Sequence, residues 1–269
     1  MVNLHKHKGN WAKCLAEIER DKEKLVTARQ GMQERIRQGT NADISKGSWF
    51  PENVNYVQGK VLWALGKYNP QIPYAKQAVD ANRMKCNYFQ LTPEVTLQGK
   101  PASQLLLEIA EEDAVKPVHK RRVLDLKHKE ALTIPADRLG EVEEAVFLAR
   151  GEKLAKDYGQ WVHDVLKSSD EKNPQITFYL ASPQDYDFSA GFWMHGANRS
   201  FRSIFDGGSK SLDDNYGCLS GVKKTGEASS QKILPYTQGQ VRRELRRLST
   251  LEIETEKSRR LNKKSQGDN

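Results

Sequence analysis

Residues 139–167 read LGEVEEAVFLARGEKLAKDYGQWVHDVLK. Apolar side chains recur here mostly at intervals of three and four, at Leu139, Val142, Val146 and Ala149 and then at Leu154, Tyr158, Trp161 and Val165. This spacing places them on one face of an α-helix. Because Gly151 interrupts the pattern and Pro135 suits a first helical turn, the sequence predicts a pair of helices over residues 135–168.

The chain before this pair shows similar helical spacing, with a smaller β component. We expect a long helix over residues 10–38, a second helical stretch from Pro51 to Leu65 and short helices over 74–85 and 102–112. Residues 95–97 predict a brief strand, and β-like composition over 121–127 and 131–134 predicts a small β element. Residues 1–170 are therefore predicted to form a mainly helical domain.

The composition changes after Ser168, where the run SSDEKNP indicates a boundary. Ile176–Leu180 predicts a buried strand, and residues 171–235 form a β-containing region rich in glycine and aromatic residues. From about Gln238 a basic helix is expected, so residues 236–269 are predicted to be a basic helix followed by a disordered tail. The predicted class is α+β, predominantly helical.

Composition excludes some classes of protein and favours others. The sequence contains no run of about 18 apolar residues, so no membrane span is expected. The first residues lack the apolar stretch of a signal peptide. Cys14, Cys86 and Cys218 are odd in number and widely spaced, which argues against a disulfide framework or a cysteine-based zinc site. Three unpaired thiols fit a reducing compartment, so we expect a cytoplasmic protein.

Positive charge is concentrated in two segments of the chain. Lysine and arginine number 43 against 35 acidic residues, a net charge of +8. Residues 116–129 hold six basic residues against one acidic residue, and residues 236–269 hold nine against five. Clustered positive charge is typical of a protein that binds the phosphate backbone of nucleic acid. The alternative interpretation is a solvated basic surface with an ordinary positive tail.

The predicted nucleic-acid contacts lie in these segments and in two others. Residues 191–202 interleave aromatic residues with arginines, an arrangement that suits base stacking and phosphate binding, although the aromatic residues could equally be core. The glycine-rich stretch 206–211 could bring a lysine to a phosphate, or could be an ordinary surface loop. The predicted contacts are Lys120, Arg121, Arg122, Trp193, Arg199, Arg202, Lys210, Arg242, Arg243, Arg246 and Arg247.

A single short motif has enzyme character. The run Val123-Leu124-Asp125-Leu126-Lys127 resembles the second half-motif of the PD-(D/E)xK nucleases, over these five residues alone. The resemblance implies that Asp125 would bind a divalent metal and that Lys127 would orient the attacking water. The nearest upstream acids, Glu111 to Asp113, fall at the end of a predicted helix rather than on a strand.

No cofactor and no metal site are predicted. The histidines are scattered, apart from the His-x-His spacing of His5 and His7 in the N-terminal arm. We therefore predict a non-catalytic nucleic-acid-binding protein, a subunit of a nucleoprotein complex with protein partners and no membrane association. The two alternatives are a metal-dependent nuclease and a structural or scaffolding subunit of a virion or complex.

Overall fold

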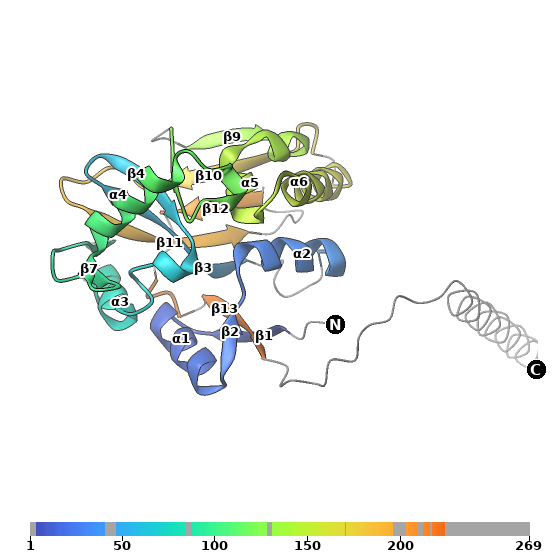
Figure 1. Ribbon diagram of the computed structural model, residues 1–269. Helices are drawn as coiled ribbons and strands as arrows, with labels where there is room; N and C mark the ends of the chain where they lie inside the picture. The colour runs from blue at the N-terminus through green and yellow to red at the C-terminus, as the bar shows by residue number, and fades with distance from the viewer. Residues whose placement is uncertain are drawn as a thin grey trace, which may run out of the picture. The chain divides into compact units, whose positions relative to one another are not determined.

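A long hairpin of two strands, β3 (Ser48–Val57) and β4 (Lys60–Ala64), lies inside the large sheet of the computed structural model (Figure 1). The structure describes residues 4–40, 47–83, 88–127, 131–169, 171–195, 203–208, 212–215 and 217–223. Every residue of β3 is buried, because both faces of the sheet are covered.

This hairpin replaces the helix that was predicted over residues 51–65. Phe50 and Val54 face one core, whereas Trp49 and Val57 face the other, which is the two-residue period of a strand. The turn at Gln58 and Gly59 has φ angles of 48° and 75°, the left-handed values that a two-residue hairpin turn requires. The helix prediction was wrong because closely spaced apolar residues also describe a strand buried on both faces.

The large sheet has eight strands in the order β8-β4-β3-β11-β12-β10-β9, with β5 paired to β11. Its remaining strands are β5 (Phe89–Gln90), β8 (Val123–Asp125), β9 (Leu132–Pro135), β10 (Gln175–Leu180), β11 (Phe188–His195) and β12 (Ser203–Gly207). All neighbours are antiparallel except β10 and β12. Strands from both sides of residue 170 interleave, so the predicted boundary there lies within one sheet.

Helices cover both faces of this sheet. One core contains residues of α2 (Ala28–Gln38), α5 (Glu143–Ala149) and α6 (Glu152–Lys167), with the 3-10 helix η4 (Ala136–Glu141) packed against α6. The other core contains residues of α1 (Trp11–Arg20), α3 (Ala75–Arg83) and α4 (Ala102–Asp113). Two short 3-10 helices are η2 (Gly66–Tyr68) and η3 (Val118–Lys120).

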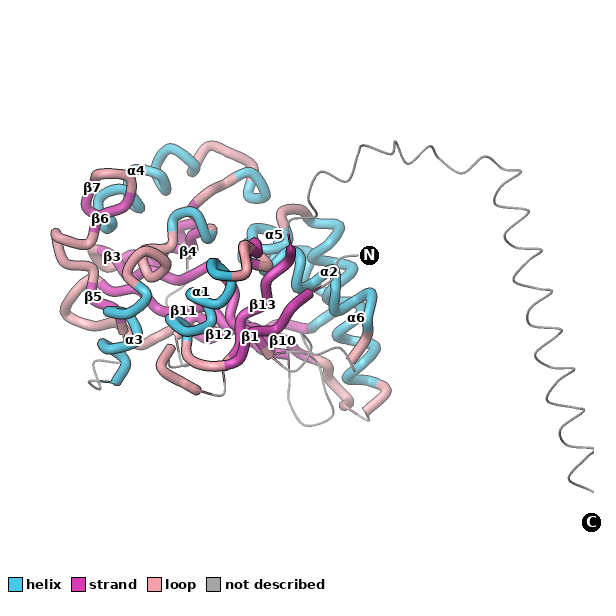
Figure 2. Tube along the Cα trace, turned by 90° about the horizontal axis from the view of Figure 1, so that it is seen from below, coloured by secondary structure: helices cyan, strands magenta, loops and turns pink. Residues whose placement is uncertain are grey.

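A second sheet joins the first and last described strands. Its order is β1 (Leu4–Lys8), β13 (Cys218–Lys223) and β2 (Glu23–Leu25), all antiparallel, and Figure 2 shows β1 beside β13. The helix predicted over residues 10–38 is broken here, because Lys22 is left-handed with φ 54° and β2 follows it. A small hairpin is formed by β6 (Thr96–Leu97) and β7 (Lys100–Pro101).

The predicted class was wrong in its balance of helix and strand. The chain is a mixed α/β protein built on a large curled sheet, not a predominantly helical one. The helix predicted over residues 102–112, the helix pair over 135–168 and the strand over 176–180 are confirmed. Across the described ranges, none of the helices has the length and apolar character needed to cross a membrane.

Candidate functional site

A pocket of about 750 Å³ lies beside the N-terminus of α2, between β2, β3 and the segment that follows β4. Its volume is within the range of small-molecule sites. Four cationic side chains line it, together with one carboxylate and several apolar residues. We call this site the cationic pocket; its charged residues are Lys24, Arg29, Glu52, Lys67 and Arg150, and its apolar residues are Leu25, Pro51, Leu65 and Ile72.

Glu52 is the buried carboxylate of this pocket. It lies on β3 with 4% of its surface exposed, on the same face as Phe50 and Val54. Its Oε2 atom accepts a hydrogen bond from the backbone N–H of Ala28 at 3.1 Å, in the first turn of α2. Burial raises the pKa of Glu52 from its ordinary 4.5 to about 7. Near neutral pH the carboxyl group is therefore only partly ionised.

Arg150 contributes a half-buried cation. It follows α5 in a left-handed conformation with φ 57°, and its guanidinium lies 5.6 Å from the centre of the Phe147 ring. One of its N–H groups donates to the backbone oxygen of Arg121. Burial, followed by the nearby positive charge of Arg29, lowers the pKa of Arg150 below its usual range. Two guanidinium groups therefore repel each other at this pocket.

The local sequence explains how Arg29 reaches the pocket. Thr27 caps α2: its side chain accepts from the backbone N–H of Gln30, and the Gln30 side chain accepts from the backbone N–H of Thr27. This capping box fixes the first turn of the helix, so that Arg29 lines the pocket from that turn. An anion placed here would meet the positive end of α2 as well as the arginines.

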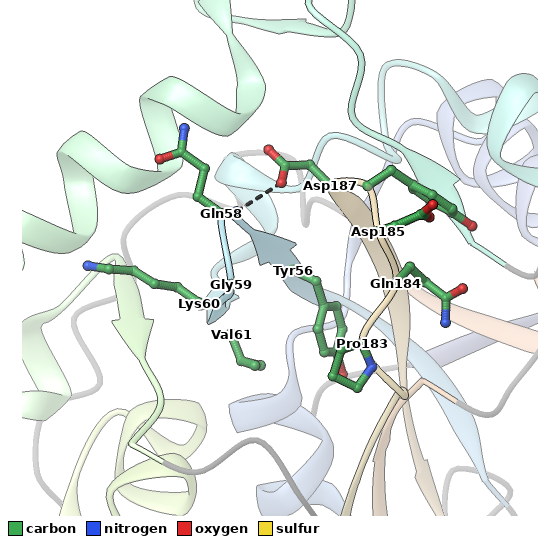
Figure 3. A pocket seen from close by; sticks show the side chains of 10 residues that line it. Tyr56, Gln58, Gly59, Lys60, Val61, Pro183, Gln184, Asp185 and Asp187 are labelled. Atoms are coloured by element: carbon green, nitrogen blue, oxygen red, sulfur yellow. Dashed lines mark hydrogen bonds between the residues drawn. The ribbon is translucent and has the colours of Figure 1, made fainter.

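A second hollow, of about 240 Å³, lies beside the turn between β3 and β4 (Figure 3). Its polar groups already serve the fold. Asp187 accepts from the backbone N–H of Gln58 at 2.8 Å, and the hydroxyl of Tyr56 accepts from the backbone N–H of Ala181 at 2.6 Å. Lys60 pairs with Asp125 at 3.1 Å. Of these two hollows, the cationic pocket is the larger, and it has four cationic side chains against one carboxylate.

Two of the predicted phosphate contacts, Arg121 and Arg122, form hydrogen bonds and ion pairs within the protein. Arg121 donates to the backbone oxygens of Lys116 and Ala114 at 2.9 and 3.1 Å. Arg122 pairs with the buried Asp113, and this arginine together with Lys116 lowers the pKa of Asp113 to about 2. Lys120 is exposed at the end of η3.

Trp193 does not offer an exposed face for stacking. It is 6% exposed, and its ring packs edge-on against Trp49 at 5.3 Å between ring centroids. Seven of the predicted contacts lie outside the described residues: Arg199, Arg202, Lys210, Arg242, Arg243, Arg246 and Arg247. Nucleic-acid binding therefore stays a prediction.

The two residues of the nuclease-like motif, Asp125 and Lys127, form ion pairs with different partners. Asp125 is on β8, as expected for a strand, but it pairs with Lys60, while Lys127 pairs with Glu143 at 3.4 Å. Within the described part of the chain, the carboxylates around Asp125 do not gather into a group of three or more potential metal ligands. Nuclease activity remains an untested prediction.

Sequence reasoning missed the cationic pocket. Arg29 fell inside the helix predicted over residues 10–38, and Lys67 followed the helical stretch predicted from Pro51 to Leu65. Glu52 was assigned to that same stretch, which is a strand in the structure. The capping pattern Thr27–Gln30 was the one local signal available, since it marks where α2 begins. Nothing in the sequence pairs that turn with Arg150, which is far away in the chain.

Comparison with known proteins identifies the fold alone. No family model and no curated protein matches the chain. A solved structure described as "Accommodation of massive sequence variation in Nanoarchaeota by the C-type lectin fold" is similar, with a TM-score of 0.57 and 13% identity over 83% of this chain and 98% of that one. The likeness points to a C-type lectin fold and not to a predominantly helical one; it gives no support to a nucleoprotein subunit and names no ligand.

Proposed function

We propose that this chain is a ligand-binding protein with a C-type lectin fold that takes a small organic anion with an apolar body into the cationic pocket. The observation that carries the proposal is the grouping of four cations around one partly protonated carboxylate and an apolar wall. Such a pocket favours a ligand that supplies the missing negative charge.

Charge balance specifies the polar end of the ligand. Arg29 and Arg150 stand close enough for one to lower the pKa of the other, and Glu52 is half-neutralised near pH 7. A carboxylate, sulfonate or phosphate between the two arginines would relieve their repulsion and accept hydrogen bonds from both. The first turn of α2 would add its positive partial charge.

The apolar residues specify the rest of the ligand. Leu25, Leu65 and Ile72 line the pocket and are only partly buried, so an occupant would remove their remaining apolar surface from water. Such burial contributes about 25 cal/mol for each Å². The similar solved structure is described as showing that the C-type lectin fold accommodates massive sequence variation, which is compatible with a pocket lined by this chain's own residues.

Two matched fluorescent dyes test the proposal. 1-Anilinonaphthalene-8-sulfonate carries an aromatic body and a sulfonate, whereas N-phenyl-1-naphthylamine has the same body without a charge. We expect saturable binding of the sulfonate and weaker binding of the neutral dye. Arg29→Met should weaken sulfonate binding about three- to fivefold, as for a partly exposed ion pair of about 0.6–1 kcal/mol, and should not affect the neutral dye.

Arg138→Met is the matched control, because Arg138 is exposed and pairs with Glu141 away from the pocket. Cooperative thermal unfolding of each variant excludes dye binding to a loosened core. Equal affinity for both dyes, or equal loss in the Arg29 and Arg138 variants, would refute an anion site at this pocket.

A further inference from the structure

A cluster of histidine and carboxylate side chains lies where β1, the end of α1 and β2 meet. One ligand atom from each of His7, Asp21 and Glu23 lies within 4.8 Å of the others. Nε2 of His7 is 2.8 Å from Oε2 of Glu23, and Nδ1 of His5 contacts the other carboxylate oxygen of Glu23. Among the described residues this is the group of histidine and carboxylate ligands close enough to share one ion.

The position of Glu23 depends on a glycine in the strand between β1 and β2. The sheet order is β1-β13-β2, so Glu23 must cross β13 to reach the histidines. It does so over Gly221, which pairs with His5 on one side and Leu25 on the other. A Cβ atom at Gly221 would lie 2.1 Å from Oε2 of Glu23.

Glu23 is also the most deeply buried member of the cluster. Its side chain is 0% exposed, whereas that of His5 is 38% exposed. A buried carboxylate requires compensation by positive charge or by a metal ion. The two histidines approach Glu23 from the same face of β1, because His5 and His7 are two residues apart on a strand.

Glu17 contacts the ring nitrogen of His7 that faces away from Glu23. Its Oε2 lies 3.3 Å from Nδ1 of His7, while the Nε2 atom of the same ring faces Glu23. A hydrogen bond at Nδ1 fixes the tautomer that leaves Nε2 able to bind a metal, and metal-bound histidines commonly have such a carboxylate partner. The cluster therefore has both potential ligands and the outer support that a metal site requires.

We propose that this cluster binds a divalent transition-metal ion of the Zn²⁺ type, with His7, Asp21 and Glu23 as ligands and His5 beside them. Imidazole with carboxylate suits Zn²⁺, Co²⁺ or Ni²⁺, whereas Ca²⁺ and Mg²⁺ prefer sets of oxygen atoms alone. The ion would join β1, the end of α1 and β2, and thus fasten the first described strand to the body.

Titration of untagged full-length protein with Co²⁺ and Zn²⁺ tests the site. We expect one equivalent of Co²⁺ to produce the visible absorption of low-symmetry nitrogen and oxygen coordination, and Zn²⁺ to displace it. Glu17→Gln should weaken Zn²⁺ binding about 10- to 100-fold, the usual effect of losing an outer partner, and His7→Gln should weaken it further.

Asp21→Ala keeps the test informative if changes at Glu23 or His7 impair folding. Asp21 is exposed and forms its salt bridge with the neighbouring exposed Arg20, so its loss should cost metal affinity without unfolding the protein. His163→Gln, which removes a partly buried histidine beside Asp164, is the matched control and should bind like the wild type. Zn²⁺ affinity unchanged in the Asp21, His7 and Glu17 variants, or absent from the wild type, would overturn the proposal.

Discussion

Glu52 on β3 accepts a hydrogen bond from the backbone N–H of Ala28, and this bond links the central hairpin to the first turn of α2. The same carboxylate is the one acidic group lining a pocket with four cations. Glu52 therefore serves both the fold and the proposed site. Its raised pKa gives each role a distinct pH dependence.

The first prediction concerns the pH dependence of stability. Because the pKa of Glu52 is about 7 in the folded state and 4.5 ordinarily, the folded chain binds more protons between these values than the unfolded chain does. The free energy of unfolding therefore falls as pH rises through this window, by up to about 3 kcal/mol. Urea unfolding at pH 5, 6, 7 and 8 measures this change.

Glu52→Gln is the comparison, because glutamine keeps an oxygen that can accept from Ala28. The difference in stability between this variant and the wild type should shift in favour of the variant as pH rises, and level off above pH 7. A difference that does not change with pH would show that Glu52 is ionised in the folded protein at all these values.

The second prediction concerns ligand affinity. A neutral Glu52 leaves the cations of the pocket unopposed, so the sulfonate dye should bind about fivefold more tightly at pH 6 than at pH 8, equivalent to about 1 kcal/mol of charge interaction. Glu52→Gln should bind with nearly the same affinity at both values. Fluorescence titration measures the dye affinity of the wild type and the variant at each pH. An equal pH dependence in the two would rule out Glu52 as the cause.

The third prediction concerns a buried arginine of α2. Arg35 is 0% exposed and donates to the hydroxyl of Tyr158 at 3.0 Å and to the backbone oxygen of Met194 at 2.7 Å. Arg35→Met would leave both acceptors buried without this donor, and should cost about 3 kcal/mol of stability, whereas Tyr158→Phe should cost about 1 kcal/mol. Urea unfolding of both variants gives the values; a smaller cost for Arg35→Met would contradict this assignment.

The fourth prediction concerns Gly221, whose missing side chain makes room for Glu23. Gly221→Ala should displace the Glu23 carboxylate from the histidines and reduce Zn²⁺ affinity about as much as Glu23→Gln does. Calorimetric titration with Zn²⁺ compares the two variants at one pH. Wild-type affinity in Gly221→Ala would mean that Glu23 does not reach the metal across β13.

The sequence predicted best the helices whose apolar residues recur at intervals of three and four. Helices α4 and α6 each bury one face, and their apolar spacing identifies them, whereas α5 is buried over Glu144–Ala149. The hairpin at Ser48–Ala64 was missed because covered strands are apolar on both faces. The break at Lys22 carries no glycine or proline signal, so the helix predicted over residues 10–38 was not divided there.

The candidate sites were less accessible to sequence reasoning. The His-x-His spacing of His5 and His7 was visible, but their carboxylate partner reaches them across an intervening strand. Arg29 and Arg150 meet because α5 and α2 pack on the same face of the sheet. Such sites arise from tertiary packing, and no local sequence pattern predicts them.

The most direct test of the proposed function is an NMR titration of methyl-labelled protein with 1-octanesulfonate, with neutral 1-octanol as the comparison. Ile72 lines the cationic pocket, whereas Ile18 and Ile109 lie in the core that contains α1 and α4. The proposal predicts saturable shifts of the Ile72 methyl signal with the sulfonate, much weaker shifts with the alcohol and none at the two core isoleucines. Unchanged Ile72 signals, or equal responses to both compounds, would contradict an anion site in this pocket.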